Sequence, residues 1–253
     1  MERWPMILFE QVSKAYDDES YAVQDLSFEV NRGEVLVLLG ISGSGKTTTM
    51  KMINRLIEPS SGQIKINGRD IMALDPVELR LDIGYAVQQV GLFPHVTIGE
   101  NIEVTPKLLG WDRQTIYERT CELLNLVRLN PTEFINRYPR QLSGGQRQRV
   151  GVARALAGDP TIILMDEPFG ALDPLTRDEL QKEFSHLQEK LSKTVIFVTH
   201  DIFEAFELGD RIAILEQGRL AQIGSPEELI HNPASEFVSR FVSSGREKIS
   251  LFQ

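Results

Sequence analysis

A short apolar run that leads directly into a glycine-rich loop constrains the fold of this chain more than any other feature. Residues 35–39 (Val-Leu-Val-Leu-Leu) are all apolar, which is typical of a β-strand covered on both faces. Residues 40–47 (Gly-Ile-Ser-Gly-Ser-Gly-Lys-Thr) match the pattern G-x-x-x-x-G-K-[ST] of a P-loop, a turn that binds nucleotide phosphates. A buried strand followed by this loop and a helix predicts an α/β fold with a mainly parallel sheet.

The chemistry of a P-loop assigns roles to its residues. Glycines let backbone N–H groups turn inward around the phosphates, and Lys46 places a positive charge on the outer phosphates. The hydroxyl of Thr47 is positioned for Mg²⁺, and the following helix directs its positive end at the anion. A glycine-rich turn without a ligand is the alternative, but the flanking strand and helix argue against it. The candidate nucleotide-binding residues are Gly40, Ser42, Gly43, Ser44, Gly45, Lys46, Thr47 and Thr48.

Two apolar patterns predict two kinds of strand. Residues 7–12, 26–30 and 63–68 alternate apolar and polar side chains, which predicts half-buried strands of an N-terminal antiparallel sheet. Residues 162–165 and 195–198 are apolar runs, which predicts buried strands at 161–165 and 194–198. A helix is expected between these two strands, and strands that alternate with helices indicate a parallel sheet. Shorter strands are expected at 212–215 and 219–223, and helices at 47–57, 111–127, 143–157, 174–191, 226–230 and 234–242.

The order of these elements indicates one domain with an insertion. Between about residues 97 and 158 no continuous apolar strand occurs, and residues 111–127 have apolar side chains at helical intervals. We expect a single domain over residues 1–253. It comprises a nucleotide-binding α/β core with the antiparallel sub-domain at 1–87 and 159–223, a helical sub-domain at 88–158, and C-terminal helices at 224–253 with a loosely held tail from residue 243.

Two acids end the apolar run at residues 162–165. A P-loop ATPase needs an acid at a neighbouring strand end to hold Mg²⁺, and Asp166 has this position. Glu167 is expected to point elsewhere and to polarise the attacking water. Two acids alone would equally well solvate a strand end, and their combination with a P-loop favours the catalytic interpretation.

Other polar side chains follow predicted strands and have less specific signals. His200 lies at the carboxyl edge of the predicted sheet, where ligands bind in open α/β folds, although a lone histidine there is more often a bystander. Gln88 follows the apolar run 83–87 and can reach a metal or a water, but a solvated loop glutamine fits as well. Tyr16 can stack on a base, Tyr21 competes for that role, and either ring can simply pack.

A second glycine-rich motif, Leu-Ser-Gly-Gly-Gln at residues 142–146, opens a predicted helix. Ser143 is placed at the N-cap and Gln146 three positions later, as in a capping box. The N-terminus of a helix offers unpaired N–H groups and partial positive charge to an anion. Ser143, Gly144, Gly145 and Gln146 form a second phosphate-binding element in addition to the P-loop. Two such elements suggest a site assembled from two pieces, which one copy or two copies of the protein supply.

Composition argues against several classes of protein. The net charge of -9 argues against binding nucleic acid or an anionic membrane by bulk electrostatics. Cys121 is the single cysteine, so no internal disulfide is expected, in keeping with a reducing cytosol. We expect Cys121 to be a small side chain of the core. Because no apolar run of roughly 18 residues occurs and residues 1–11 lack an apolar core, we expect neither a membrane span nor a signal peptide.

The order of the motifs resembles the ATP-binding cassette (ABC) family of transporter ATPases. The resemblance extends from about Phe9 to Phe241, and the pairing of Leu-Ser-Gly-Gly-Gln with Met-Asp-Glu-Pro is highly specific. It implies that Tyr16 stacks on adenine and that Gln88 contacts Mg²⁺ and water. It also implies that Asp166 binds Mg²⁺ through water, that Glu167 is the general base, and that His200 senses the γ-phosphate.

The same resemblance implies a head-to-tail pair of cassettes that binds two ATP. Ser143, Gly145 and Gln146 of one copy would cap the ATP held by the P-loop of the other, and Asp173 would lie at the dimer seam. The implied cofactors are ATP and Mg²⁺. The implied partners are a second ATPase subunit, transmembrane permease subunits and, indirectly, an extracytoplasmic substrate-binding protein, without nucleic acid, at the cytoplasmic face of the membrane.

Several segments are similar to the ATPases of osmoprotectant importers, which take up glycine betaine, choline or carnitine. These segments are residues 51–56, 88–95, 105–108 with Trp111, and 168–174. Residues 88–95 are the natural contact for a membrane partner, although their apolar side chains fit an ordinary core as well. Many relatives carry a pair of regulatory domains after the cassette, so regulation through such domains is not expected here unless the chain is truncated.

Other functions compete with this one. Soluble ABC ATPases that act on DNA or ribosomes carry long coiled coils between the motifs or two cassettes in tandem, whereas this chain has one cassette and no sustained heptads. A nucleotide-binding switch is disfavoured by Asp166 and Glu167, which favour turnover. An importer ATPase for another small solute, such as an amino acid, is a further alternative.

Overall fold

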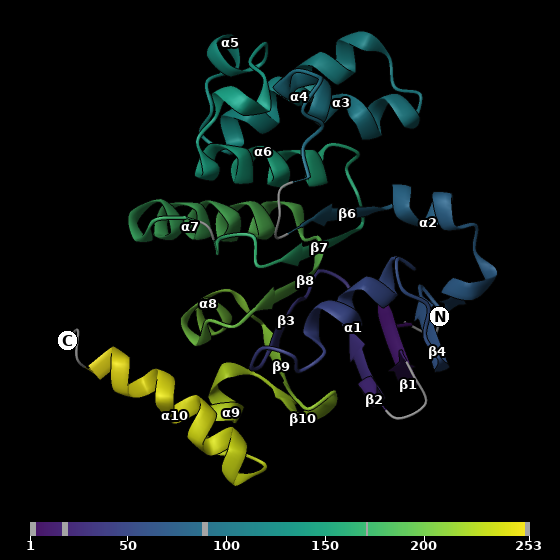
Figure 1. Cartoon of the computed structure of the whole chain (residues 1–253), viewed down its shortest axis with the longest axis vertical. Coiled ribbons are helices and arrows are strands. Elements are labelled where there is room, and N and C mark those ends of the chain that lie inside the picture. Colours follow the sequence, from purple (N-terminus) through teal and green to yellow (C-terminus); the bar gives the residue numbers. More distant parts are fainter. Residues whose placement is uncertain (1–3, 17–19, 88–90, 171, 251–253) are drawn as a thin grey trace. The chain divides into compact units, whose positions relative to one another are not determined.

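The computed structural model describes residues 4–16, 20–87, 91–170 and 172–250 (Figure 1). Side chains are described for all of these except residues 183, 187, 189–191 and 244–250. The chain forms two compact units, which are described separately. The first unit is Met1–Pro76 with Thr194–Gln253, and the second unit is Val77–Lys193.

The first unit contains the predicted antiparallel sheet. Its strands have the order β2-β1-β4-β5, and β1 pairs antiparallel with both β2 and β4. Phe9 and Phe28 stack at a centroid distance of 4.4 Å on the buried face, because alternate side chains of paired strands meet there. The strands are β1 (Ile7–Ala15), β2 (Tyr21–Val30), β4 (Ser61–Ile66) and β5 (Arg69–Asp70).

The first unit also contains strands of the mainly parallel sheet that the sequence predicts. They have the order β10-β9-β3-β8, in which β3 is parallel to both β9 and β8, whereas β10 is antiparallel to β9. Every residue of β3 and β8 is buried, which accounts for their continuous apolar sequences. Leu39 lies in register with Thr199, so residues 40 and 200 leave the sheet at the same edge. The strands are β3 (Val35–Leu39), β8 (Thr194–Thr199), β9 (Arg211–Glu216) and β10 (Arg219–Gly224).

The helices of the first unit correct two predicted boundaries. The prediction that the first helix ends at residue 57 is wrong, because Arg55 has a left-handed φ of 53° and donates to the carbonyl groups of Ile71 and Leu74. The prediction that the last helix ends at residue 242 is also wrong, because polar residues without a proline do not stop a helix. The helices are α1 (Lys46–Ile53), η1 (Ile71–Ala73), α8 (Ile202–Leu208), α9 (Pro226–His231) and α10 (Glu236–Ser250).

The second unit combines two parallel strands with most of the helices. Strand β6 (Ile83–Ala86) pairs with β7 (Ile162–Asp166), and α6 packs on β6. Gly84 permits this approach, since a side chain there would meet the carbonyl group of Ala155. Figure 1 shows α3 to α6 as a cluster of helices. The helices are α2 (Pro76–Leu81), α3 (Ile98–Leu108), α4 (Arg113–Leu126), α5 (Pro131–Phe134), η2 (Pro139–Gln141), α6 (Gly144–Leu156) and α7 (Pro174–Leu191).

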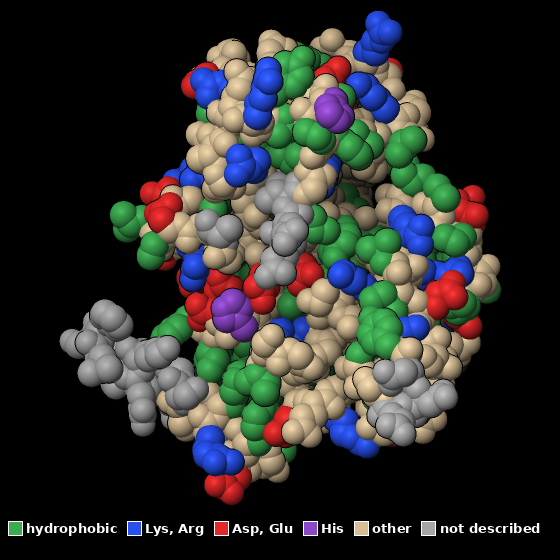
Figure 2. Space-filling view, in the orientation of Figure 1, with side chains coloured by type: hydrophobic (Ala, Val, Ile, Leu, Met, Phe, Trp, Pro, Cys, Tyr) green, Lys and Arg blue, Asp and Glu red, His purple; other side chains and the backbone are tan. Residues whose placement is uncertain are grey.

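Periodicity did not predict all of these helices. Helices α2, α3, α5 and α8 are absent from the predicted set, although Thr97 and Glu100 form a capping box at the start of α3 that the sequence pattern T-x-x-E would have indicated. None of the helices in the described part of the chain combines the length and hydropathy needed to cross a bilayer. On the face shown in Figure 2, basic and acidic side chains are interspersed.

Candidate functional site

The P-loop of the first unit presents the N-terminus of α1 without a side-chain cap. Gly45 occupies the N-cap with a left-handed φ of 98°, and a Cβ atom there would lie 2.5 Å from the carbonyl oxygen of Ala22. Only glycine fits this position, and glycine has no side chain to cap the helix. A helix start without a side-chain cap is the kind of terminus at which anions bind.

Lys46 is held at the loop by its own backbone. Its Nζ atom donates to the carbonyl oxygens of Gly40 at 2.8 Å and Ile41 at 2.9 Å, and its side chain is buried. Burial of an ammonium group is costly unless polar partners surround it. The loop thus supplies the partners that keep a positive charge next to the uncapped helix end.

Ser44 carries a buried hydroxyl group for which the described residues provide no hydrogen-bond partner. The residue is 1% exposed, so water reaches it poorly. Buried polar atoms are normally paired, and an unpaired one in a phosphate-binding loop fits a ligand oxygen as the missing partner. The geometry of the loop therefore fits a nucleotide phosphate.

His200 follows β8 at the edge of the sheet where the P-loop follows β3. Its side chain is exposed, whereas the neighbouring Thr199 is buried. The Thr199 hydroxyl donates to the buried carboxylate of Glu204 at 2.5 Å and accepts from the Asp201 N–H at 2.9 Å. Sequence reasoning did not find Glu204, because no local pattern marks a carboxylate whose partner lies five residues earlier on another element.

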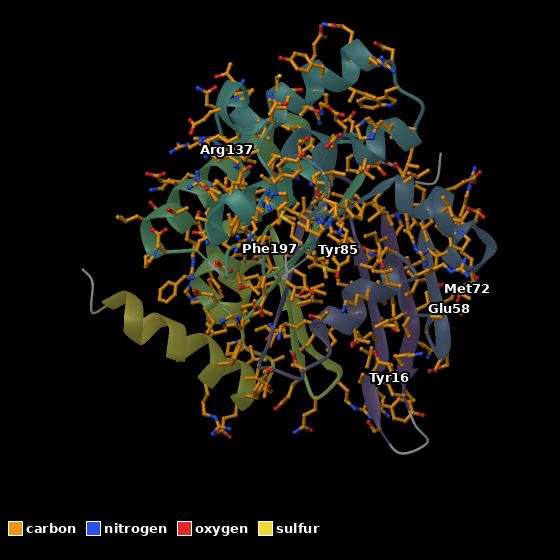
Figure 3. All side chains as sticks on the ribbon, turned by 45° about the horizontal axis from the view of Figure 1, so that its top comes forward. Tyr16, Glu58, Met72, Tyr85, Arg137 and Phe197 are labelled. Atoms are coloured by element: carbon orange, nitrogen blue, oxygen red, sulfur yellow. The ribbon has the colours of Figure 1, made fainter. Side chains whose placement is uncertain are left out.

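The two candidate base-stacking residues, Tyr16 and Tyr21, lie at the adjoining ends of β1 and β2. Both rings are exposed, Tyr16 by 62% and Tyr21 by 51%, so neither is a core side chain. The Nζ atom of Lys14 lies 5.5 Å from the centroid of the Tyr16 ring, which Figure 3 shows at the end of its strand.

Gln88, the predicted contact for metal and water, lies outside the described residues.

In the second unit, the two acids at the end of β7 have different surroundings. Asp166 is 4% exposed, whereas Glu167 is half-buried and has a left-handed φ of 47°. Tyr85 lies on the adjacent strand β6 (Figure 3). Burial, and secondarily the charge of Asp166, raise the pKa of Tyr85 to about 12, so this phenol stays protonated at neutral pH.

The start of α6 confirms the predicted capping box. The Gln146 N–H donates to Ser143 Oγ at 3.2 Å, and the Ser143 N–H donates to Gln146 Oε1 at 2.9 Å. These bonds use two of the four N–H groups that a helix leaves unpaired at its N-terminus. The N–H groups of Gly144 and Gly145 are left, and space next to Gly144 is open. The start of α6 therefore offers two N–H groups of the kind that pair with an anion.

Asp173 has a structural role that the sequence did not reveal. Its carboxylate caps α7 by accepting from the Thr176 N–H at 3.0 Å. Hydrogen bonds from the backbone and the side chain of Thr176 lower the pKa of Asp173, which favours its ionised form. The Asp173 side chain is exposed.

The described residues contain no cluster of three or more His, Cys, Asp or Glu side chains that would hold a metal ion by themselves. The first unit offers the Thr47 hydroxyl as an oxygen donor, and the second unit offers the Asp166 carboxylate. Mg²⁺ commonly uses one or two protein oxygens and completes its shell with water and substrate phosphates. Each of these groups is therefore of a kind that suits Mg²⁺ arriving with a nucleotide.

A cavity of about 340 Å³ opens in the second unit beside the segment that follows Gln88. Among the described residues that line it, Arg154 alone is charged, and polar and apolar surfaces contribute in similar measure. The lining includes Tyr85, Gly91, Phe93, Val104, Thr105 and Arg154.

Comparisons with known proteins agree with these features. The family model described as ABC transporter matches residues 23–170. The chain is 57% identical over 244 residues to the glycine betaine/carnitine/choline transport ATP-binding protein OpuCA of Bacillus subtilis, covering 96% of this chain and 63% of that protein. It is 47% identical over 246 residues to the glycine betaine uptake system ATP-binding protein YehX of Escherichia coli, covering 97% and 79%.

A solved structure shows the same fold. A dimeric post-hydrolysis state of the ATP-binding cassette MJ0796, bound to ADP and Pi, is 36% identical with a TM-score of 0.79 and covers 87% of this chain and 98% of that chain. The chain spans 63% of the length of its Bacillus relative OpuCA.

Proposed function

This chain belongs to the ABC transporter family, and on that premise we propose that it is the ATP-hydrolysing subunit of an importer for osmoprotectants such as glycine betaine, carnitine or choline. The observation that carries the proposal is the presence of two anion-binding helix ends in one chain. One is the uncapped start of α1 beside Lys46, and the other is the start of α6, where the capping box leaves two N–H groups unpaired.

The proposed site is shared between two copies. The P-loop residues 40–48 hold the phosphates, and the exposed ring of Tyr16 stacks on the adenine. Ser143, Gly144, Gly145 and Gln146 of a second copy bind the outer phosphate in a head-to-tail dimer, with Asp173 at the seam. The dimeric form of a related cassette supports this arrangement.

Each catalytic side chain has one proposed task. Thr47, Gln88 and Asp166 would hold Mg²⁺, which screens the phosphate charge when bound with ATP. Glu167 accepts a proton from the attacking water as general base, and Lys46 neutralises charge on the outer phosphates. His200 donates a hydrogen bond to the terminal phosphate from the edge of β8.

The proposed partners are transmembrane permease subunits at the cytoplasmic face of the membrane, and through them a substrate-binding protein. We assign residues 88–158 to a helical sub-domain whose segment at 88–95 contacts the permease. The cavity beside Phe93 supports this assignment, because half of the Phe93 side chain is exposed next to a concave surface. No interaction with nucleic acid is proposed.

Uptake by cells tests the function directly. In a strain deleted for this chain, we expect the wild type but not Glu167→Gln to restore uptake of labelled glycine betaine, choline or carnitine. Restored uptake of an amino acid instead would support the alternative of an importer for another small solute. Turnover of ATP with no effect on any uptake would support a non-transport ABC ATPase.

A further inference from the structure

The segment that follows Gln88 is held by side chains from two helices of the second unit. Arg154, in the last turn of α6, donates from Nη1 to the carbonyl oxygen of Gly91 at 2.8 Å, and its guanidinium carbon lies 5.9 Å from the centroid of the Phe93 ring. Asn101, in the first turns of α3, accepts from the Phe93 N–H at 2.8 Å and donates to the Phe93 carbonyl oxygen at 3.1 Å. Residues 91–93 have no regular secondary structure of their own, so these side chains supply their backbone partners.

Burial makes these contacts costly to lose. Asn101 is 0% exposed, and its Nδ2 atom also donates to the Thr97 carbonyl oxygen at 2.8 Å. Arg154 is half-buried, and this partial desolvation lowers the pKa of its guanidinium group. A hydrogen bond of a desolvated charged group is stronger than one at the surface.

Helix α6 joins this contact to the motif at its other end. Ser143 is the N-cap of α6, and Arg154 lies in its last turn. A straight helix of this length spans roughly 20 Å at about 1.5 Å per residue, and it transmits displacement because its backbone hydrogen bonds resist bending. One rigid element therefore connects the proposed ATP-capping motif to residues 91–93.

We propose that Arg154 and Asn101 are positioning residues through which the start of α6 controls the conformation of residues 91–93. This inference rests on the proposed function, because it assumes that Ser143 meets the ATP of a second copy. When the start of α6 is engaged, Arg154 carries the Gly91 carbonyl group with the helix, and Asn101 keeps Phe93 attached to α3. The exposed ring of Phe93 then presents that movement to the membrane partner.

Hydrogen exchange measured by mass spectrometry on the full chain tests the proposal. The background is Glu167→Gln, which should retain ATP, and the compared variants add Arg154→Met or Arg154→Lys. In the background, ATP is expected to slow exchange at residues 143–147 and at residues 91–97. Arg154→Met should keep the first effect and reduce the second by roughly tenfold, the loss that corresponds to one charge-assisted hydrogen bond. Arg154→Lys retains a donor and should give an intermediate effect.

Arg119→Met is the matched control. Arg119 also donates from α4 to a backbone carbonyl group of the second unit, that of Leu156 at 3.0 Å, but it does not contact residues 91–93. Arg119→Met should therefore leave unchanged the slowing of exchange by ATP at residues 143–147 and at residues 91–97. Thermal unfolding of each variant shows whether it is folded, and Arg154→Lys provides the test if Arg154→Met is not.

The outcomes separate the inference from the function. Equal slowing at residues 91–97 with and without Arg154 would overturn the inference while leaving the function intact. Equal loss in the Arg119 and Arg154 variants would also overturn it, since it would indicate a general loss of stability. Absence of any ATP effect at residues 143–147 in the background would refute the shared site, and the inference with it.

Discussion

Ser143 and Gln146 hydrogen-bond to each other reciprocally across the first turn of α6, at 3.2 and 2.9 Å. Because Ser143 Oγ acts as acceptor in this pair, its hydroxyl hydrogen can still be donated to an outside oxygen. The capping box therefore stabilises the helix and also orients the serine hydroxyl beside the N–H groups of Gly144 and Gly145.

Ser143→Ala should lower both stability and hydrolysis. Loss of the cap costs about 1 kcal/mol of unfolding free energy. Loss of a bond to a charged phosphate should reduce ATP turnover by roughly tenfold or more. Ser225 forms the same box with Glu228 at the start of α9, so Ser225→Ala is the control: it should lose similar stability and keep its turnover.

Ser143→Arg should abolish hydrolysis, because a large side chain would fill the space next to Gly144. Binding of one ATP at the P-loop of the same chain should persist, as measured by equilibrium titration with a fluorescent ATP analogue. If that binding is lost instead, the serine acts in its own subunit and the shared site is wrong.

Glu167→Gln should retain ATP binding and lower the hydrolysis rate by roughly 10²–10⁴, the usual contribution of a general base. The rate of phosphate release under saturating ATP measures this decrease in hydrolysis. Glu179→Gln is a suitable control, since Glu179 is exposed and pairs with Arg128 at 3.1 Å. Near-normal turnover of Glu167→Gln would remove Glu167 from the role of base.

The Glu167→Gln chain should dimerise when ATP is added, because each ATP would bind two copies. Light scattering measures the change in mass. The double variant Glu167→Gln with Lys46→Met should not dimerise, because it lacks the ammonium group of Lys46, the only charged side chain of the P-loop. A Glu167→Gln chain that stays monomeric at saturating ATP would argue strongly against a shared site.

Tyr85 should make the protein sensitive to alkaline pH. Its pKa is raised from 10.0 to about 12 in the folded chain, so the unfolded chain loses this proton first as the pH rises. The folded state is therefore favoured below pH 10, and that contribution is lost between about pH 10 and 12. Tyr85→Phe should flatten the decrease in thermal unfolding midpoint over this range. An unchanged slope would show that Tyr85 does not titrate as described.

Local patterns predicted the features that depend on nearby residues. The capping box at Ser143 joins residues three positions apart, so the local sequence was enough to predict it. The strands followed from apolar runs and alternation, since burial on one or two faces determines these patterns. The P-loop was identified because its glycines adopt backbone conformations that few other residues can adopt.

Distant contacts were not predictable in this way. The end of α1 depends on Arg55 and carbonyl groups at residues 71 and 74, and no propensity of residues 54–57 indicates them. Similarly, Arg154 and Gly91 are 63 positions apart, and an arginine in the last turn of a helix is ordinarily a solvated side chain.

The sequence by itself determined the chemical elements of this protein: the phosphate-binding loop, the acids after β7, the second glycine-rich helix start and the buried strands between them. Each is encoded by neighbouring residues, because capping, glycine geometry and face-by-face burial act over a few positions. Only the tertiary structure decided which side chains hold the ends and connecting segments of these elements in place, among them Arg154 on Gly91, Asn101 on Phe93 and Glu204 on Thr199. These contacts depend on desolvation and on the approach of separate elements, which arise only once the chain has packed.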